Sequence, residues 1–374
     1  MEHPERGVLQ LAEIIDSCDI RPGQKDLTPA QATAVLQAAG RIAPEATVTS
    51  VHSTVLGAGQ SMMSELARLE LAYDVDGAGP RTVVVKSGCL DPERREVADR
   101  FRLYRSELDF YTHLAPLVPV RTAAHYAAVS ADASTDFTLV LEDLSDLRAV
   151  RQLDGCGAVD AAAVVRALAA LHAAWWERVD ELPVPVSRFG TDRQIASIVT
   201  TFEDGWRTTR ELARSRLPAR VVHIGDRWAE VLPVLLRRLT GPPTLCHGDV
   251  RLDNVLFAAD GVVLLDWQLL TSAHGVLDVG YFVSQSVRAG ARHGRDRTFL
   301  DLYVAELAAA GVRVDTDEAW RAYRAAVLAM LIFPVTLLGG YDALDHLGRA
   351  TARRMLDRSV DAIVELEAWD VIGR

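Results

Sequence analysis

A short stretch near residue 250 carries the residue types that phosphate and metal chemistry need. Asp249 is followed, after four spacer residues, by Asn254, and Asp266 comes twelve residues after Asn254. Amide and carboxylate oxygens are hard ligands that suit Mg²⁺, and such a site leaves coordination positions for water and phosphate oxygens. We therefore expect Asn254 and Asp266 to hold Mg²⁺, which leaves Asp249 available as a general base.

A predicted hairpin explains this spacing. Two short apolar runs flank Asp260-Gly261, and Asp-Gly is a strong signal for a β-hairpin turn. If this pair forms the two-residue turn, Asn254 and Asp266 lie within one residue of being opposed across the hairpin. Their side chains could then share one metal ion.

Asp249 lies on the loop just before this hairpin. A carboxylate there could accept the proton of a substrate hydroxyl while the hydroxyl oxygen attacks a phosphoryl group. The spacing is a weak signal alone, because Asp249, Asp253 and Asn254 could instead only cap turns. The same chemistry also needs groups that hold phosphates, and candidates occur upstream.

The first of these candidates is a lysine at the end of a strand. Val83-Val84-Val85 leads into Lys86, and Glu107 lies on the following predicted helix, where its carboxylate could pair with the lysine. A lysine held in this way suits the α- and β-phosphates of a nucleotide. Alone, a lysine at the end of a strand could simply be a solvated edge residue.

The second candidate is a glycine-containing turn between two predicted strands. It comprises Gly57, Gly59, Gln60 and Ser61, whose backbone N–H groups could face phosphate oxygens. The segment matches neither a P-loop nor a dinucleotide-binding fingerprint, since Met62 stands where a third glycine would fall. Alone, it could be an ordinary hairpin turn.

The elements that would position these residues change type near residue 150. Strands are predicted over 47–56, 65–75, 82–86 and 137–142, of which 65–75 alternates between apolar and polar residues and 137–142 is an apolar run, and one long helix is predicted over 92–113. Helical patterns follow over 160–179, 192–216, 220–239, 297–310, 317–340 and 346–369, with one small β element over 255–265. Upstream, Thr28-Pro29-Ala30-Gln31 is a helix start with a capping box.

We therefore expect an α+β protein with a ligand cleft between its lobes. Residues 1–45 form an N-terminal helical extension. Residues 46–145 form a nucleotide-binding lobe with an antiparallel sheet and one long helix, and residues 146–374 form a larger, mostly helical lobe for catalysis and acceptor binding.

The composition excludes several classes of protein. The 374 residues are 49% hydrophobic and 24% charged, which excludes a disordered chain, and four dispersed cysteines indicate neither a zinc ribbon nor a disulfide framework. The net charge of −11 disfavours a nucleic-acid partner. The longest apolar run, 328–340, is too short to span a bilayer and contains Pro334, so we expect a buried helix, no membrane insertion and a cytoplasmic location.

Taken together, the motifs resemble the aminoglycoside-phosphotransferase-like kinases over residues 50–370. The resemblance is carried by the glycine turn, Lys86, Glu107, the segment 141–144, the segment 168–172, His247-Gly248-Asp249, Asn254 and Asp266. Asp266-Trp267-Gln268 and the later Asp278-Val279-Gly280-Tyr281-Phe282 are similar to the choline-kinase and ecdysteroid-kinase-like branch.

This resemblance implies a two-lobed protein-kinase-like fold that binds ATP or GTP with Mg²⁺. It implies that Asp249 is the base, Asn254 and Asp266 hold the metal, Lys86 and Glu107 position phosphates, and Glu142, Asp143 and Leu144 form a hinge that contacts adenine through backbone groups. His247 would brace the loop. Arg251 would approach the transferred phosphate, although a solvated loop arginine is equally compatible with its place.

The expected acceptor is a small-molecule alcohol. The family phosphorylates aminoglycosides, macrolides, choline, sugars, steroid alcohols and hydroxyacyl thioesters, and the sequence does not choose among them. Two other functions stay open: a nucleotide-binding pseudokinase that regulates a partner, and a nucleotidyl transferase on the same scaffold. A pseudokinase commonly lacks the base, a metal ligand or the lysine, whereas all four positions are occupied here.

Overall fold

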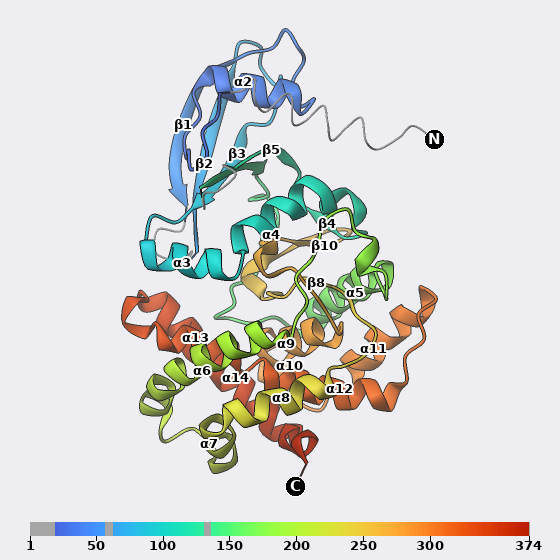
Figure 1. Ribbon diagram of the computed structural model, residues 1–374. Helices are drawn as coiled ribbons and strands as arrows, with labels where there is room; N and C mark the ends of the chain where they lie inside the picture. Colours follow the sequence, from blue (N-terminus) through green and yellow to red (C-terminus); the bar gives the residue numbers. More distant parts are fainter. Residues whose placement is uncertain (1–18, 57–62, 131–135, 374) are drawn as a thin grey trace. The chain divides into compact units, whose positions relative to one another are not determined.

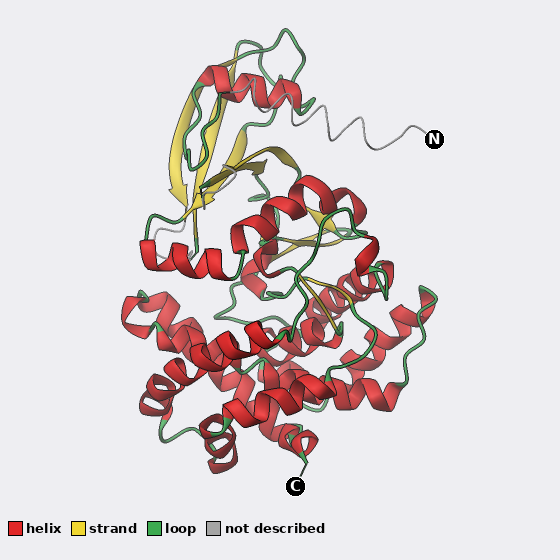
Figure 2. Cartoon of the chain, viewed as in Figure 1, coloured by secondary structure: helices red, strands yellow, loops and turns green. Residues whose placement is uncertain are grey.

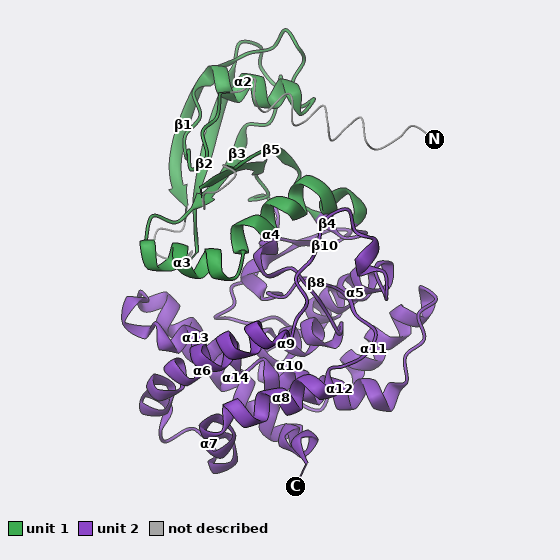
Figure 3. Cartoon of the chain, viewed as in Figure 1, with its two compact units in different colours: residues 1–117, 122–146 green, residues 118–121, 147–374 purple. Residues whose placement is uncertain are grey.

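The computed structural model describes residues 19–56, 63–130 and 136–373. The chain divides into two compact units (Figure 3). Unit 1 comprises residues 1–117 and 122–146, and unit 2 comprises residues 118–121 and 147–374. Unit 1 contains a large antiparallel sheet, and unit 2 is mostly helical (Figure 2), in agreement with the expected α+β class.

The sheet of unit 1 has five antiparallel strands in the order β1-β2-β3-β6-β5 (Figure 1). The strands are β1 (Val48–Leu56), β2 (Ser64–Tyr73), β3 (Thr82–Gly88), β5 (His125–Ser130) and β6 (Phe137–Glu142). Four of them confirm the predicted strands to within two residues at either end. The additional strand, β5, was missed because its six residues do not alternate between apolar and polar.

Helix α2 (Pro29–Ala38) begins at the predicted capping box, where the Thr28 hydroxyl accepts a hydrogen bond from the N–H of Gln31. Its apolar face, which includes Val35 and Leu36, packs with Leu69 and Val85 of the sheet in one hydrophobic cluster. Residues before the sheet therefore contribute to the core of unit 1.

The long helix predicted over 92–113 is wrong as one element. The structure has α3 (Pro92–Arg100), α4 (Leu103–Asp109) and a π-helical turn, Phe110–Leu114. The break lies at Arg102, whose φ of 55° is left-handed and cannot continue an α-helix. Glu107 consequently lies on α4, a short helix whose placement is set by its own buried side chains.

Unit 2 contains most of the helices. They are α5 (Ala158–Ala174), α6 (Asp192–Ala213), α7 (Ala219–Asp226), α8 (Trp228–Arg238), α9 (Val276–Ser286), α10 (Ala289–Arg292), α11 (Asp296–Ala309), α12 (Thr316–Ala329), α13 (Ile332–Gly339) and α14 (His346–Glu365). The helices predicted over 220–239 and 317–340 are each divided in two. Helix α9 was missed because all of its residues are buried, so no polar face marks a helical period.

Unit 2 also contains more β structure than the one predicted hairpin. The hairpin strands β9 (Val255–Ala258) and β10 (Gly261–Leu264) lie in a sheet of order β4-β10-β9-β7, with β4 (Arg121–Thr122) and β7 (Arg148–Ala149) at its edges. A second small sheet pairs β8 (Thr244–Cys246) with β11 (Thr271–Ala273). The four strands outside the hairpin are two or three residues long, too short for an alternating pattern.

One helical stretch, residues 316–339, is long and apolar enough to cross a membrane by length and composition. In the structure it is divided between α12 and α13, and 67% of its apolar window is buried within the protein. Core helices of globular proteins pass the same test, so this stretch is weak support for a membrane span.

Helices α6 and α13 approach each other closely at a glycine contact. A Cβ on Gly205 would overlap the carbonyl oxygen of Val335, and a Cβ on Gly339 would lie 2.9 Å from the Cα of Gly205. Glycine is needed at this crossing because no larger residue fits between the two backbones.

Replacing Gly205 with alanine should therefore destabilise unit 2. We expect Gly205→Ala to lower the free energy of unfolding by about 1–3 kcal/mol, because the added methyl group must push the helices apart. Gly290 of α10 has open space around its Cβ position, and Gly290→Ala should cause no loss. Denaturant unfolding followed by circular dichroism would measure both, and equal stabilities would contradict the prediction.

Candidate active site

The β9–β10 hairpin brings Asn254 next to Asp266. Val255 pairs with Leu264, and the N–H of Leu265 donates to the carbonyl oxygen of Asn254 at 2.9 Å. Asn254 therefore faces Leu265, and Asp266 is the next residue, so the two lie within one residue of being opposed, as predicted. The predicted turn pair was wrong in detail, since Ala258 pairs with Gly261 and the two turn residues are 259 and 260.

Two unusual backbone conformations shape the segments on either side of this hairpin. Asp266 has a left-handed backbone with φ 63° and ψ 74°, which is uncommon outside glycine and clusters at functional sites. Gly248 has φ 83°, and a Cβ there would overlap the carbonyl oxygen of Leu269. Glycine before Asp249 is therefore a requirement of the backbone.

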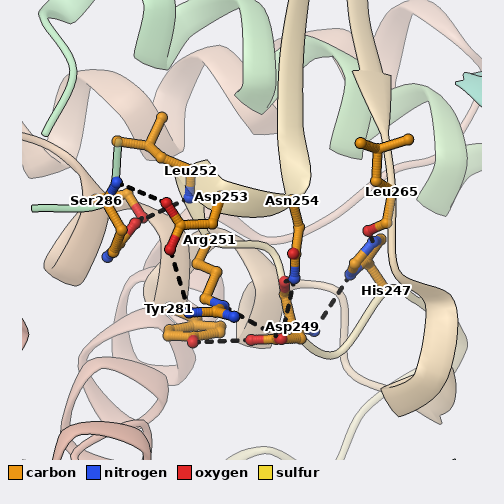
Figure 4. Close-up of polar contacts among 10 residues, drawn as sticks. His247, Asp249, Arg251, Leu252, Asp253, Asn254, Leu265, Tyr281 and Ser286 are labelled. Carbon is orange, nitrogen blue, oxygen red and sulfur yellow. Dashed lines mark hydrogen bonds and ion pairs between the residues drawn. The ribbon is translucent and has the colours of Figure 1, made fainter. Parts of the chain in front are cut away.

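The carboxylate of Asp249 has three polar neighbours in unit 2 (Figure 4). Asn254 Nδ2 donates to Asp249 Oδ2 at 3.0 Å and to the Asp249 carbonyl oxygen at 2.9 Å. The Tyr281 hydroxyl donates to Oδ1 at 3.0 Å, and Arg251 Nε lies 3.5 Å from Oδ2. The side chain of Asp249 keeps 17% of its surface exposed, so a ligand can still reach it.

Opposing effects act on the charge of Asp249. Burial raises the pKa of its carboxyl group above the usual value, and the nearby Asp266 carboxylate raises it further. Arg251, His247 and the hydrogen bond from Tyr281 act in the opposite direction and lower this pKa. A carboxylate whose pKa is raised is a stronger base, which suits a group that must accept a proton.

Arg251 lies beside two carboxylates, with Nε 3.5 Å from Asp249 and Nη1 3.3 Å from Asp253. The Asp253 carboxylate also accepts a hydrogen bond from the backbone N–H of Gln152 at 2.9 Å. Arg251 is half-buried, so it is more constrained than the solvated loop arginine that the sequence also allowed. Its contact with a transferred phosphate stays a prediction.

His247 holds the loop of residues 247–254 from inside. Its Nε2 lies 2.9 Å from the Leu265 carbonyl oxygen, and the N–H of Asp249 donates to its Nδ1 at 3.2 Å. Since a carbonyl oxygen only accepts and a backbone N–H only donates, Nε2 is the donor and Nδ1 the acceptor in these two contacts. His247 is fully buried and braces the loop.

Asp278 of α9 fixes the backbone of the same loop. Its carboxylate accepts the N–H groups of His247 at 2.7 Å and of Gly248 at 3.0 Å, and His172 Nε2 lies 3.3 Å away. Burial raises the pKa of Asp278, but His172, His247 and the backbone N–H groups outweigh it, so the net pKa is lowered. The carboxylate is thus held in its charged form.

His172, Asp278 and Cys246 could be taken for a metal site, because their ligand atoms lie within 4.8 Å of one another. Hydrogen bonds account for the two oxygens of Asp278, however, and His172 Nδ1 contacts the Tyr303 hydroxyl at 2.9 Å. Burial raises the pKa of Cys246 well above its usual range, which favours the thiol. We interpret the three residues as structural.

The far end of the 247–254 loop is held by Gln152, which is fully buried. Its Oε1 accepts the N–H of Leu252 at 2.9 Å and the hydroxyl of Ser286 at 3.0 Å. Arg358 of α14 donates to the carbonyl oxygen of Gln152 and to that of Gln285 in α9. The loop is therefore supported at both ends by buried polar groups.

In unit 1 the structure brings Lys86 and Glu107 together. Lys86 Nζ lies 2.6 Å from Glu107 Oε1, and the two side chains are only 6% and 1% exposed. A buried charge is costly unless it is paired, so each residue holds the other in place. Their role toward phosphates stays a prediction.

The predicted hinge residues follow β6. The backbone N–H of Glu142 donates to the Ala124 carbonyl oxygen at 2.8 Å, and Asp143 forms an ion pair with Arg68 at 2.7 Å. Leu144 is buried. The Glu142 N–H is thus engaged within the sheet region, and contact of residues 142–144 with an adenine base stays a prediction. Gly57, Gly59, Gln60 and Ser61 lie outside the described residues.

Residues 58–314, more than half of the chain, match the ecdysteroid kinase-like family. The chain belongs to the ecdysteroid kinase-like family. By this membership the protein is a small-molecule kinase. Among curated protein sequences, none matches the chain.

Solved structures with the same fold support this placement. The choline kinase of Cryptosporidium parvum has 9% identity and a TM-score of 0.58, covering 90% of this chain and 96% of its own. A microcompartment-associated aminopropanol kinase has 15% identity and a TM-score of 0.53, covering 91% and 98%. At such identities the likeness shows the fold, which is protein-kinase-like.

Sequence reasoning missed three residues of this ecdysteroid kinase-like site. Asp278 and Tyr281 were noted only as part of a branch motif, and Gln152 was not noted at all. Their contacts join segments that are 30 or more residues apart. No local pattern reports such contacts. The nearest available signal was the spacing of Asp278 and Tyr281, which lie three residues apart in a mostly apolar run. On a helix this spacing places both side chains on one face.

Replacing Asp278 with asparagine should loosen the 247–254 loop. Because the asparagine amide offers only one acceptor oxygen to two backbone donors, we expect Asp278→Asn to lower the free energy of unfolding at pH 7 by about 2–3 kcal/mol. The pKa of Asp278 is lower in the folded protein than in the unfolded chain, where it is near 3.8. The ionised carboxylate therefore stabilises the folded protein above pH 3.8, and this stabilisation is lost as the pH falls through the pKa of the folded state.

The difference in the free energy of unfolding between wild type and Asp278→Asn should therefore become smaller below about pH 4. Urea unfolding from pH 7 to pH 3 would measure it, with the exposed turn residue Asp260→Asn as the control. A difference that stays constant across this range would contradict the assignment of charge to Asp278.

Proposed function

We propose that the protein transfers the γ-phosphate of ATP, or of GTP, to a hydroxyl group of a small-molecule alcohol. The observation that carries this proposal is the arrangement of the 247–254 loop and the adjoining hairpin. The Asp249 carboxylate, which is mostly buried and has a raised pKa, is hydrogen-bonded to Asn254, and Asp266 follows the residue opposite Asn254. A base beside two oxygen ligands is the arrangement that phosphoryl transfer to an alcohol needs.

The donor set of Asn254 and Asp266 fits a divalent cation. The Nδ2 of Asn254 is committed to two oxygens of Asp249, so its Oδ1 is turned away from them and can bind a cation. Together with the Asp266 carboxylate it offers only oxygen ligands, as Mg²⁺ prefers. When bound, Mg²⁺ would neutralise the charge that develops on the nucleotide phosphates.

Lys86 and Glu107 would position the nucleotide. The ammonium group has three donors, of which the Glu107 carboxylate takes one at 2.6 Å. Held in this way, the Lys86 ammonium group would bind oxygens of the α- and β-phosphates. Because Glu107 is almost fully buried on α4, it would hold the lysine against thermal motion without itself contacting the nucleotide.

Asp249 would take the proton in this reaction. As the acceptor oxygen forms its bond to the γ-phosphorus, the bond from that phosphorus to the nucleotide diphosphate oxygen breaks, and the acceptor proton moves to the Asp249 carboxylate. Arg251, 3.5 Å from that carboxylate, would offer positive charge to the moving phosphoryl group. The products are a phosphate monoester and the nucleoside diphosphate.

The acceptor would be a small alcohol in the cytoplasm. A panel of candidate acceptor alcohols can be chosen from the names of the relatives. It contains an ecdysteroid, after the family, and choline and an aminopropanol, after the two similar structures. Aminoglycosides, macrolides and sugars complete it. Release of ADP coupled to a spectroscopic readout, with each compound at saturating ATP and Mg²⁺, tests the proposal. An AMP-bearing product would instead support nucleotidyl transfer, and no product with any compound would favour a pseudokinase.

Nucleotide binding should raise the melting temperature, and Asp266 should be required for it. A ligand that binds only the folded protein adds about 2.7 kcal/mol of stability at 100 times its dissociation constant. We expect ATP with Mg²⁺ to shift the melting curve upward for wild type and much less for Asp266→Ala. ATP with EDTA is the control. An undiminished shift for the variant would remove Asp266 from the metal site.

Substitution of Asp249 should separate binding from chemistry. Asp249→Asn keeps the side-chain volume, so we expect the melting shift with ATP and Mg²⁺ to stay close to that of wild type. Phosphoryl transfer to the identified acceptor should slow by about 10²-fold or more, because the base is lost. Single-turnover rates at saturating nucleotide measure this. A variant with the wild-type rate would show that Asp249 is not the base.

A further inference from the structure

Tyr281 is the one aromatic hydroxyl that contacts the Asp249 carboxylate among the described residues. Its hydroxyl lies 3.0 Å from Oδ1, and the side chain is 1% exposed, so the ring is fixed within the protein (Figure 4). This contact involves neither the proposed metal ligands nor the Lys86–Glu107 pair. A buried tyrosine usually finds a partner for its hydroxyl, but here the partner is the expected base.

Several contacts fix Tyr281 in place. Its ring stacks on Phe333 of α13, with centroids 4.1 Å apart and an interplanar angle of 10°. The preceding Gly280 lies so close to α12 that a Cβ would come within 2.9 Å of the Ala326 Cβ. Further along α9, Gln285 Nε2 donates to the Met330 carbonyl oxygen at 2.7 Å. The hydroxyl therefore approaches Asp249 from a rigid support.

The hydrogen bonds of Asp249 distinguish its two oxygens. Oδ2 accepts from Asn254 at 3.0 Å and faces Arg251 at 3.5 Å, whereas Oδ1 accepts from Tyr281. A carboxylate oxygen has two lone-pair directions, so the Tyr281 hydroxyl occupies one on Oδ1 and leaves the other. Rotation of the carboxylate would break the contacts at both oxygens.

We propose that Tyr281 is a positioning residue that orients the Asp249 carboxylate so that the second lone pair of Oδ1 receives the proton of the acceptor hydroxyl. This rests on the proposed function. In the step, the proton leaves the acceptor oxygen for Oδ1, the acceptor oxygen bonds to the γ-phosphorus, and the bond to the nucleotide diphosphate breaks. Tyr281 keeps its own proton throughout and donates the same hydrogen bond before and after.

Burial and the adjacent Asp249 raise the pKa of Tyr281 well above its usual range, in agreement with a hydroxyl that stays protonated. The proposal also locates the acceptor. Its reacting hydroxyl lies on the Oδ1 side of Asp249, the side of Tyr281, whereas Asn254 and Arg251 lie on the Oδ2 side.

Unit 2 offers a matched control for this residue. Tyr323 of α12 is also fully buried, and its hydroxyl also donates to an aspartate, Asp296 Oδ1, at 2.7 Å. Tyr281→Phe and Tyr323→Phe therefore remove the same group from the same kind of hydrogen bond. They differ in whether the aspartate that loses its donor is the proposed base.

The test measures transfer from ATP with Mg²⁺ to whichever compound of the panel wild type phosphorylates fastest. We expect Tyr281→Phe to lower kcat by about 10- to 100-fold while the KM for that acceptor changes by less than about three-fold, because the ring and its stacking on Phe333 remain. The melting shift with ATP and Mg²⁺ should equal that of wild type. Tyr323→Phe should lower the melting temperature similarly but keep kcat within about two-fold.

Three results would overturn the proposal while the proposed function stands. They are a Tyr281→Phe enzyme with the wild-type kcat, a loss of kcat that Tyr323→Phe shares, and a Tyr281→Phe protein that fails to fold while Tyr323→Phe folds. The last would make Tyr281 structural. A wild-type protein that phosphorylates no compound of the panel would overturn the proposed function and this inference together.

Discussion

The loop of residues 247–254 takes its conformation from one carboxylate. Asp278 accepts two consecutive backbone N–H groups, those of His247 and Gly248, and both oxygens are buried with the charge retained. The left-handed Gly248, which carries the second of these donors, turns the backbone into Asp249. The position of Asp249, and so of every contact it makes, depends on this interaction.

Helix α9 extends the same support along the loop. Asp278 and Tyr281 lie one turn apart on one face, so the first holds the backbone before Asp249 and the second holds its side chain. At the end of the helix, Ser286 meets Gln152, which binds the N–H of Leu252. A fully buried helix is suited to this task because its neighbours on all sides restrict its motion.

The sequence predicted those parts of the site whose residues are close along the chain. The spacing of Asn254 and Asp266 across a hairpin was correct to one residue, although the turn pair was misassigned, because hairpin register follows from local turn chemistry. Four strands of unit 1 were predicted from local strand patterns, whereas the break at Arg102 and the buried helix α9 left no periodic signal. The Tyr281–Asp249 contact spans 32 residues and depends on packing that no local pattern encodes.

The contact of Arg358 with Gln152 has a consequence for how the protein is made. The two residues are 206 positions apart, and Arg358 lies on α14, close to the end of the sequence. During synthesis, the segment around Gln152 is produced long before Arg358. Until Arg358 is available, the carbonyl oxygen of Gln152 lacks this hydrogen-bond donor. Contacts between such distant positions also slow folding, since a long loop must close first. The 247–254 loop therefore reaches its supported conformation only after α14 has been synthesised.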